Sequence, residues 1–141
     1  MHGRIDTVTM DPLVLVDGAL TKVRDEADPH TMLRLYGDFL ATVALRHIPV
    51  QLVIRDTATA GPDARAVWAE LHAERLAGMT IFATTLHDRG HLRHDVTVDD
   101  ARDILWTYNS AELYQLLVIE RDWTPERLGR WVAAALAAAL L

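Results

Sequence analysis

The chain has 141 residues, half of them hydrophobic, which suits a single domain with a sizeable core and argues against intrinsic disorder. Acidic residues outnumber basic ones by 20 to 14, so the cationic face of a nucleic-acid-binding domain is not expected. The sequence has no cysteine, no apolar run as long as a membrane span and no signal-peptide pattern. We therefore expect a cytoplasmic protein that, through this chain alone, contacts neither DNA nor a membrane.

The first 22 residues carry the weakest structural signal. Two apolar stretches, VTM at 8–10 and LVLV at 13–16, could form a short strand or be disordered. We therefore treat 1–22 as an N-terminal segment without an assigned fold and without a helix-turn-helix pattern, and 23–141 as the folded domain.

From residue 28 onward, helix start and stop signals divide the chain into five units. Asp28-Pro29 supplies an N-cap and a favourable first helical residue, and Pro49 interrupts the apolar spacing that follows. A second, shorter helix is predicted over 50–59, ended by the Ala-Gly-Pro stretch at 60–62.

The third predicted helix runs from about residue 62 to residue 87. Gly90 follows it at the position where a left-handed C-terminal cap is expected. Thr97 and Asp100, three residues apart, resemble a capping box with Asp in the glutamate's place and open a fourth helix.

The fourth helix contains Asn109 and Glu112, a second capping-type pair that predicts a bend or restart. The last helix opens at Thr124-Pro125 and carries an apolar stripe at i, i+3, i+4 and i+7. The sequence therefore predicts an all-α fold, an antiparallel bundle of about five helices.

Three histidines, His87, His91 and His94, lie in the stretch HDRGHLRH. A helical zinc site needs two histidines on one face, as at spacing i, i+4, and a third ligand held nearby. His87 and His91 have that spacing, but Gly90 lies between them and is expected to end the helix. We predict no metal site here and interpret the stretch as a connector between helices.

No other motif predicts catalysis. The sequence lacks GxGxxG, GxxxxGK[ST] and GxSxG, and its pairs Asp25-Glu26 and Asp99-Asp100 lie at or near helix starts, where acids stabilise exposed N–H groups. We therefore predict that the chain is not an enzyme and uses no cofactor.

Apolar and polar side chains mix on the first, third and fourth helices in a way that predicts a pocket for a largely apolar small molecule. The alternative is that the same residues form plain core. His72 and Arg75 stand out because a polar group turned inward needs a partner. The pocket candidates are Tyr36, Phe39, Trp68, His72, Arg75, Met79, Trp106 and Tyr108.

Several segments, among them VRDEADPHTMLRLYGDFL and above all LWTYNSAELYQLLVIERDWTPERLGRWV, resemble the C-terminal regulatory domain of TetR-like transcriptional repressors. The resemblance covers about residues 23–141. It implies a domain that binds a small effector and forms a homodimer, with ligand binding shifting the spacing of two DNA-reading heads.

In that family the last two helices pair with their symmetry mates as a four-helix bundle, here residues 99–120 and 125–140. The small residues and the tryptophan of the last helix suit such an interface, although a core helix could look the same. The implied dimer-interface residues are Leu113, Leu117, Leu128, Trp131, Ala135 and Leu136.

The chain departs from the family in one respect, because the 22 residues before the similarity are too few for the DNA-reading domain. We expect a fragment, a truncated regulator, or a relative that has lost DNA binding. Two alternatives remain: a standalone small-molecule-binding or protein-interaction module that reuses the fold, and, least favoured, a metal-dependent enzyme built around His87, His91 and His94.

Overall fold

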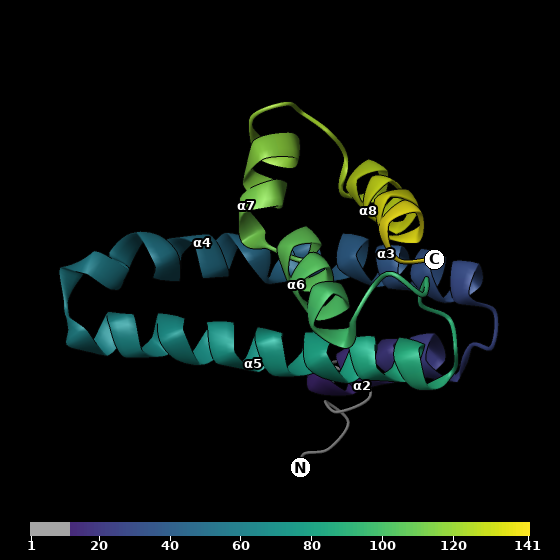
Figure 1. Ribbon diagram of the computed structural model, residues 1–141. Coiled ribbons are helices and arrows are strands. Elements are labelled where there is room, and N and C mark those ends of the chain that lie inside the picture. The colour runs from purple at the N-terminus through teal and green to yellow at the C-terminus, as the bar shows by residue number, and fades with distance from the viewer. Residues whose placement is uncertain (1–11) are drawn as a thin grey trace, which may run out of the picture.

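The computed structural model describes the backbone of residues 12–141 and the side chains of 18–43 and 46–141, and within these ranges it contains helices and no strand (Figure 1). The helices are α2 (Pro12–Asp25), α3 (Pro29–Arg46), α4 (Ile48–Thr57), α5 (Pro62–Asp88), α6 (Val98–Tyr108), α7 (Ala111–Tyr114) and α8 (Pro125–Leu140). A 3-10 turn (Ala58–Ala60) extends α4, and a π-helical turn (Gln115–Ile119) extends α7. The prediction of an all-α helical bundle is confirmed.

The prediction for the LVLV stretch is wrong, because residues 13–16 lie inside helix α2 and form neither a strand nor a disordered segment. A short apolar run has no resolvable period, so the sequence could not distinguish a strand from a helix. Tertiary packing decides the matter, since α2 packs against α3 and buries Val23 in the core. Helix α2 also runs continuously across the division predicted between residues 22 and 23, and the VTM stretch lies outside the described residues.

Three of the predicted helix starts, those of α3, α6 and α8, coincide with side-chain caps. The Asp28 carboxylate accepts hydrogen bonds from the Thr31 N–H and hydroxyl, and these bonds lower the pKa of Asp28. Thr97 and Asp100 form the expected capping box, and the Thr124 hydroxyl accepts from the Arg127 N–H. Each cap satisfies an amide that the first helical turn leaves unbonded.

The break near Asn109 is confirmed, but the predicted Asn109–Glu112 cap is wrong in detail. Ser110 is the N-cap residue of α7, with no side-chain bond to the helix. The Asn109 side chain is engaged elsewhere, with Arg75 and Tyr36. The region predicted as one dimer helix, 99–120, is therefore divided into α6, α7 and the π-helical turn.

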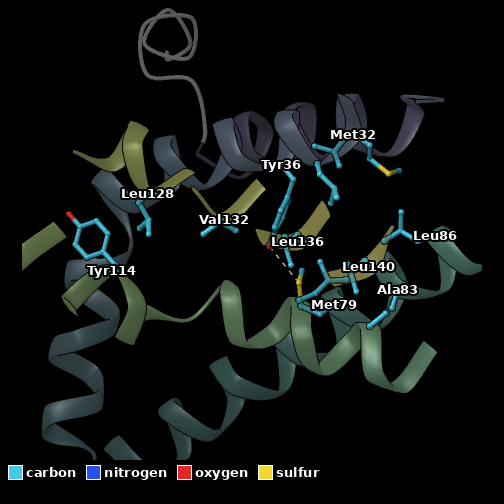
Figure 2. Close-up of a cluster of buried hydrophobic side chains, with 14 of the residues drawn as sticks. Met32, Tyr36, Met79, Ala83, Leu86, Tyr114, Leu128, Val132, Leu136 and Leu140 are labelled. Carbon is cyan, nitrogen blue, oxygen red and sulfur yellow. Dashed lines mark hydrogen bonds between the residues drawn. The ribbon is translucent and has the colours of Figure 1, made fainter. Parts of the chain in front are cut away.

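Helix α3 packs against α8 in the most extensive helix–helix contact of the described chain. Gly37 and Gly129 face each other there, and a methyl group on either would collide with the carbonyl of the other. Because glycine has no Cβ, the two backbones approach more closely than other residues permit. Leu136 and Leu140 of α8, fully buried, join residues of α3 and α5 around this contact (Figure 2).

Helices α4 and α5 form a long hairpin whose connecting end projects from the rest of the molecule (Figure 1). Val50 and Val53 of α4 are 58% and 62% exposed, and Val67 near the start of α5 is 46% exposed. In the C-terminal half of α5, Met79 and Ala83 belong to the hydrophobic core, and α6 packs against α5. The hairpin is thus buried where it meets the bundle and open along its length.

Candidate functional site

A cavity of about 180 Å³ lies where α3, α4 and α8 meet Arg75 of α5 and the junction of α6 with α7. Between α3 and α4 the axis bends by 65°, which moves α4 away from α8. Seven lining residues are apolar and five carry polar atoms, a mixture typical of a ligand-binding site. The lining residues are Phe39, Leu40, Val43, Ile48, Gln51, Arg75, Tyr108, Asn109, Ser110, Leu113, Leu128 and Val132.

Three of the eight predicted pocket residues line this cavity: Phe39, Arg75 and Tyr108. Tyr36 and Met79 lie beside it in the core, with exposed fractions of 0% and 8%. The remaining three, Trp68, His72 and Trp106, form a row of aromatic contacts next to Arg75 and do not line the cavity.

A chain of hydrogen bonds connects the cavity wall to the core. The Arg75 Nε donates to Asn109 Oδ1 at 2.7 Å, and Asn109 Nδ2 donates to the Tyr36 hydroxyl at 2.8 Å. The Tyr36 hydroxyl in turn donates to the sulfur of Met79 at 3.5 Å, the dashed line in Figure 2. Burial raises the pKa of Tyr36 to about 12, so the phenol stays protonated and able to donate.

The Arg75 guanidinium is held in place from several sides. It donates to the backbone carbonyl of Trp106 at 2.8 Å and lies 5.3 Å from the centroid of the Trp106 ring. Its other terminal nitrogen is 3.5 Å from His72 Nδ1. Burial lowers the pKa of Arg75, against which the nearby Tyr36 and Glu112 act. The charge is therefore fixed in position while being partly removed from water.

The aromatic row extends from Arg75 toward the open end of the hairpin. The His72 ring makes an edge contact with Trp68, with ring centroids 4.1 Å apart, and lies 5.6 Å from the Trp106 ring. Burial lowers the pKa of His72, and the charge of Arg75 lowers it further, whereas Glu112 raises it. The indole Nε1 of Trp106 is buried without a hydrogen-bond partner among the described residues.

Sequence reasoning missed much of the cavity wall. Leu113 and Leu128 were predicted for a dimer interface and line the cavity instead of lying only on an outer face. Asn109 carried a visible signal, since an asparagine at a helix break is a polar group with free hydrogen-bonding capacity. The aliphatic members look like ordinary core in the sequence. The lining residues not predicted at all are Leu40, Val43, Ile48, Gln51, Asn109, Ser110 and Val132.

The residues predicted for a dimer interface occupy three different environments. Leu128 and Leu136 are 6% and 0% exposed within one subunit, so their side chains contribute to its own core. Leu113, Leu117 and Ala135 are partly buried. Trp131, at 38% exposed, is the one large hydrophobic side chain of α8 that reaches the surface of the described chain.

Trp131 belongs to an aromatic cluster that joins the outer face of α8 to the cavity. Its ring lies 5.6 Å from that of Tyr108, which lines the cavity, and 6.0 Å from that of Trp123. The Arg127 guanidinium lies 3.9 Å from the centroid of the Trp123 ring, within range of a cation–π interaction. Tyr108 thus contacts both the cavity and the exposed aromatic surface.

The HDRGHLRH stretch connects the end of α5 to the C-terminal end of α8, and Arg93 makes the bonds to α8. Gly90 has a φ of 73° and ends α5, as predicted, with the His91 N–H donating to the Leu86 carbonyl. The backbone N–H and a guanidinium nitrogen of Arg93 donate to the carbonyls of Leu140 and Ala138 at 2.8 and 2.9 Å. These bonds satisfy carbonyls at the C-terminal end of α8 that have no partner within the helix.

The three histidines of the same stretch do not form a cluster that could bind a metal ion. His87 and His94 are exposed, whereas His91 is half-buried with its Nε2 atom unpaired among the described residues. Within residues 12–141 no group of three or more His, Asp or Glu side chains has an arrangement that could hold a metal ion.

Within the described range no single helix is long and apolar enough to cross a membrane, although α3 and α4 together satisfy that test as a pair bent by 65°. Comparisons with protein-family models, with curated proteins and with solved structures give no match to the chain.

Proposed function

We propose that the chain is the effector-binding and homodimerisation domain of a TetR-like transcriptional regulator, acting in the cytoplasm. The observation that carries the proposal is the cavity of about 180 Å³, whose wall combines apolar side chains with a fixed guanidinium. The sequence resemblance supplies the class of regulator. The position of the cavity at the bend between α3 and α4 supports the binding role, because Val43 and Ile48 on either side of the bend both line a space that close packing would otherwise fill.

The link between Tyr108 and Trp131 supports coupling between effector binding and subunit pairing. A ligand in the cavity would contact Tyr108, whose ring contacts the exposed Trp131 on α8. Displacement of Tyr108 would therefore change the surface through which two copies are proposed to pair. Such coupling requires that the ligand bind one state of the dimer better than the other.

Subunit pairing is tested by light scattering after size exclusion at tens of micromolar protein. The wild-type chain is expected to be a dimer, and Trp131→Glu is expected to be a monomer because it places a charge in the paired surface. Val53→Glu is the matched control, since Val53 is an exposed apolar residue on α4, away from α8. A monomeric wild-type protein would refute the pairing proposal.

The exposed valines of the α4–α5 hairpin favour a second candidate function, a protein-interaction module. The same experiment separates the two. If Val53→Glu abolishes self-association and Trp131→Glu does not, the hairpin is the interaction surface and the TetR-like arrangement of the subunits is wrong.

Effector binding is tested by calorimetric titration with small apolar compounds of about the size of benzene, because an engineered cavity of about 150 Å³ binds benzene. Val43→Trp fills the cavity from α3 and is expected to abolish binding while the helical circular dichroism spectrum is retained. Val53→Trp, on the exposed surface of α4, is the matched control. Equal binding by wild type and Val43→Trp would place the ligand elsewhere.

A further inference from the structure

Arg75 is the only charged residue among the described residues that line the cavity. Its Nε and one terminal nitrogen donate to Asn109 and to the Trp106 carbonyl, and its other terminal nitrogen lies 3.5 Å from His72 Nδ1, so none of its partners is a carboxylate. No ion pair within 4.0 Å joins Arg75 to a carboxylate among residues 18–43 and 46–141. A guanidinium has five N–H donors, so it retains capacity for a further acceptor.

The carboxylate of Glu112 raises the pKa of Arg75, but Glu112 itself is paired with another residue. Its Oε2 lies 3.5 Å from a terminal nitrogen of Arg55, and its side chain is 47% exposed. Arg55 also donates to Gln115 and pairs with Asp56, so it holds Glu112 at the outer surface. The positive charge in the cavity wall thus has no direct counter-ion among the residues whose side chains are described, although the whole chain has a formal charge of −6.

Burial of the Arg75 charge without a counter-ion is energetically unfavourable. Removing a charge from water is costly unless an opposite charge or strong acceptors compensate for it. Uncharged partners compensate only partly, and burial lowers the pKa of Arg75 accordingly. A carboxylate from a ligand would complete the compensation, because carboxylates match the planar fork of the guanidinium.

The rest of the wall restricts the ligand to one with a single acidic group and an apolar body. The rest of the wall carries no charge, since Phe39, Leu40, Val43, Ile48, Leu113, Leu128 and Val132 are apolar and Gln51, Tyr108, Asn109 and Ser110 are uncharged. The volume of about 180 Å³ slightly exceeds that of an engineered cavity of about 150 Å³ that binds benzene. A benzene-sized body with one carboxylate therefore suits the space.

We propose that this cavity binds a small monocarboxylic acid, with the carboxylate on the Arg75 guanidinium and the apolar body against the α3 and α8 side chains. This inference rests on the proposed effector-binding function and names the chemical class of the effector. A neutral ligand would leave the guanidinium unpaired, and a cationic ligand would add repulsion to it.

The test compares sodium benzoate with benzamide, a neutral compound of nearly the same shape, by isothermal titration calorimetry. Benzoate is expected to bind wild type at least about tenfold more tightly than benzamide does, since hydrogen bonds to charged groups are the stronger ones. Nitrogen–proton correlation spectra supply a second readout. The indole signal of Trp106, whose ring lies 5.3 Å from the guanidinium carbon, is expected to shift with benzoate.

Two variants test the role of the charge. Arg75→Met removes the charge and keeps an unbranched apolar stem, and it is expected to abolish the preference for benzoate over benzamide. Arg102→Met on α6 is the matched control, because Arg102 pairs with Asp99 and Asp103 and does not line the cavity. Gln51→Glu keeps Arg75 and adds a nearly isosteric carboxylate to the wall, and it is expected to weaken benzoate binding about tenfold or more by repulsion.

The outcomes separate this inference from the function on which it rests. If benzamide binds in the cavity as tightly as benzoate, the carboxylate proposal is overturned and effector binding stands. If Arg75→Met folds and binds benzoate as wild type does, or if Gln51→Glu leaves benzoate affinity unchanged, the proposal is equally overturned. If neither these probes nor the neutral benzene-sized compounds bind, both proposals fail.

Discussion

Helix α3 presents two adjoining regions that are packed in opposite ways. Along the seam with α8, Gly37 and Gly129 bring the backbones together until no space remains for a methyl group. On the neighbouring flank, Phe39, Leu40 and Val43 face a cavity of about 180 Å³. Within two turns of one helix, a contact too close for a methyl group therefore adjoins unfilled space.

Added volume should destabilise the contact of α3 with α8 at Gly37 and Gly129 more than the cavity wall, and Gly37→Ala gives the largest expected effect. The added methyl group would collide with the Gly129 carbonyl, and a loss of about 3 kcal/mol or more in the free energy of unfolding, or failure to fold, is expected. The measurement is urea denaturation followed by circular dichroism.

Gly78→Ala is the matched control for that experiment. Gly78 lies within α5 and has no atom within 4 Å of an added methyl group, so alanine should stabilise the protein by about 0.5 to 1 kcal/mol. If both substitutions stabilise the protein, the close approach of α3 to α8 is wrong.

The second largest loss of stability is expected from a substitution in the polar wall of the cavity. Asn109→Ala removes the acceptor of the Arg75 Nε and the donor to the Tyr36 hydroxyl oxygen, so two buried or part-buried polar atoms each lose a partner. A loss of about 2 kcal/mol is expected from urea denaturation. Ser110→Ala, one residue further on and without a side-chain bond to its helix, should change stability by less than about 0.5 kcal/mol. Equal effects of the two substitutions would contradict the hydrogen-bond chain.

The apolar wall of the cavity should tolerate added volume that the seam does not. Val43→Leu extends into the cavity, and a change of less than about 1 kcal/mol is expected. Ala133→Val adds volume where the Ala133 methyl group already lies close to Gly37, and a loss of about 1 to 3 kcal/mol is expected. Denaturation of both variants in parallel measures the difference, and a larger loss for Val43→Leu would show that the flank is as fully packed as the seam.

The smallest expected effect is a dependence on pH through His72, next to the cavity wall. Its pKa is lowered by burial first and by Arg75 second, with Glu112 acting in the opposite direction, so folding favours the neutral ring. The stability that His72 contributes is complete above about pH 6.5, the usual value for the unfolded chain, and is lost as the pH falls through the lower folded-state pKa.

Comparing wild type with His72→Gln isolates this contribution from those of the other titrating groups. The urea midpoint of wild type should fall more steeply between pH 7.5 and pH 5 than that of the variant. Parallel curves for the two proteins would contradict the assignment of the pKa shift to His72.

Most helices after residue 28, and several of their ends, followed from local signals in the sequence, whereas α2 did not and α4 begins at Ile48, before Pro49. Asp28, Thr97 and Thr124 cap helices with their own side chains, and Gly90 ends α5 with a positive φ, so residues a few positions apart determined these boundaries. The apolar stripe of α8 likewise identified its buried face. Capping and periodicity are properties of the nearby chain, and a single sequence displays them directly.

The cavity and the close contact beside it were decided only by the tertiary structure. Gly37 and Gly129 lie far apart in the sequence, and nothing local to either indicates that it faces the other. The sequence around Asn109 predicts a cap at a helix break, whereas in the fold its side chain bonds to Arg75 and Tyr36 from other helices. Leu128 likewise reads as an interface residue until the bend between α3 and α4 leaves space beside it. Unfilled volume arises from how helices fit together across the fold, so the sequence determined which residues could be buried, and only packing determined where a ligand could enter.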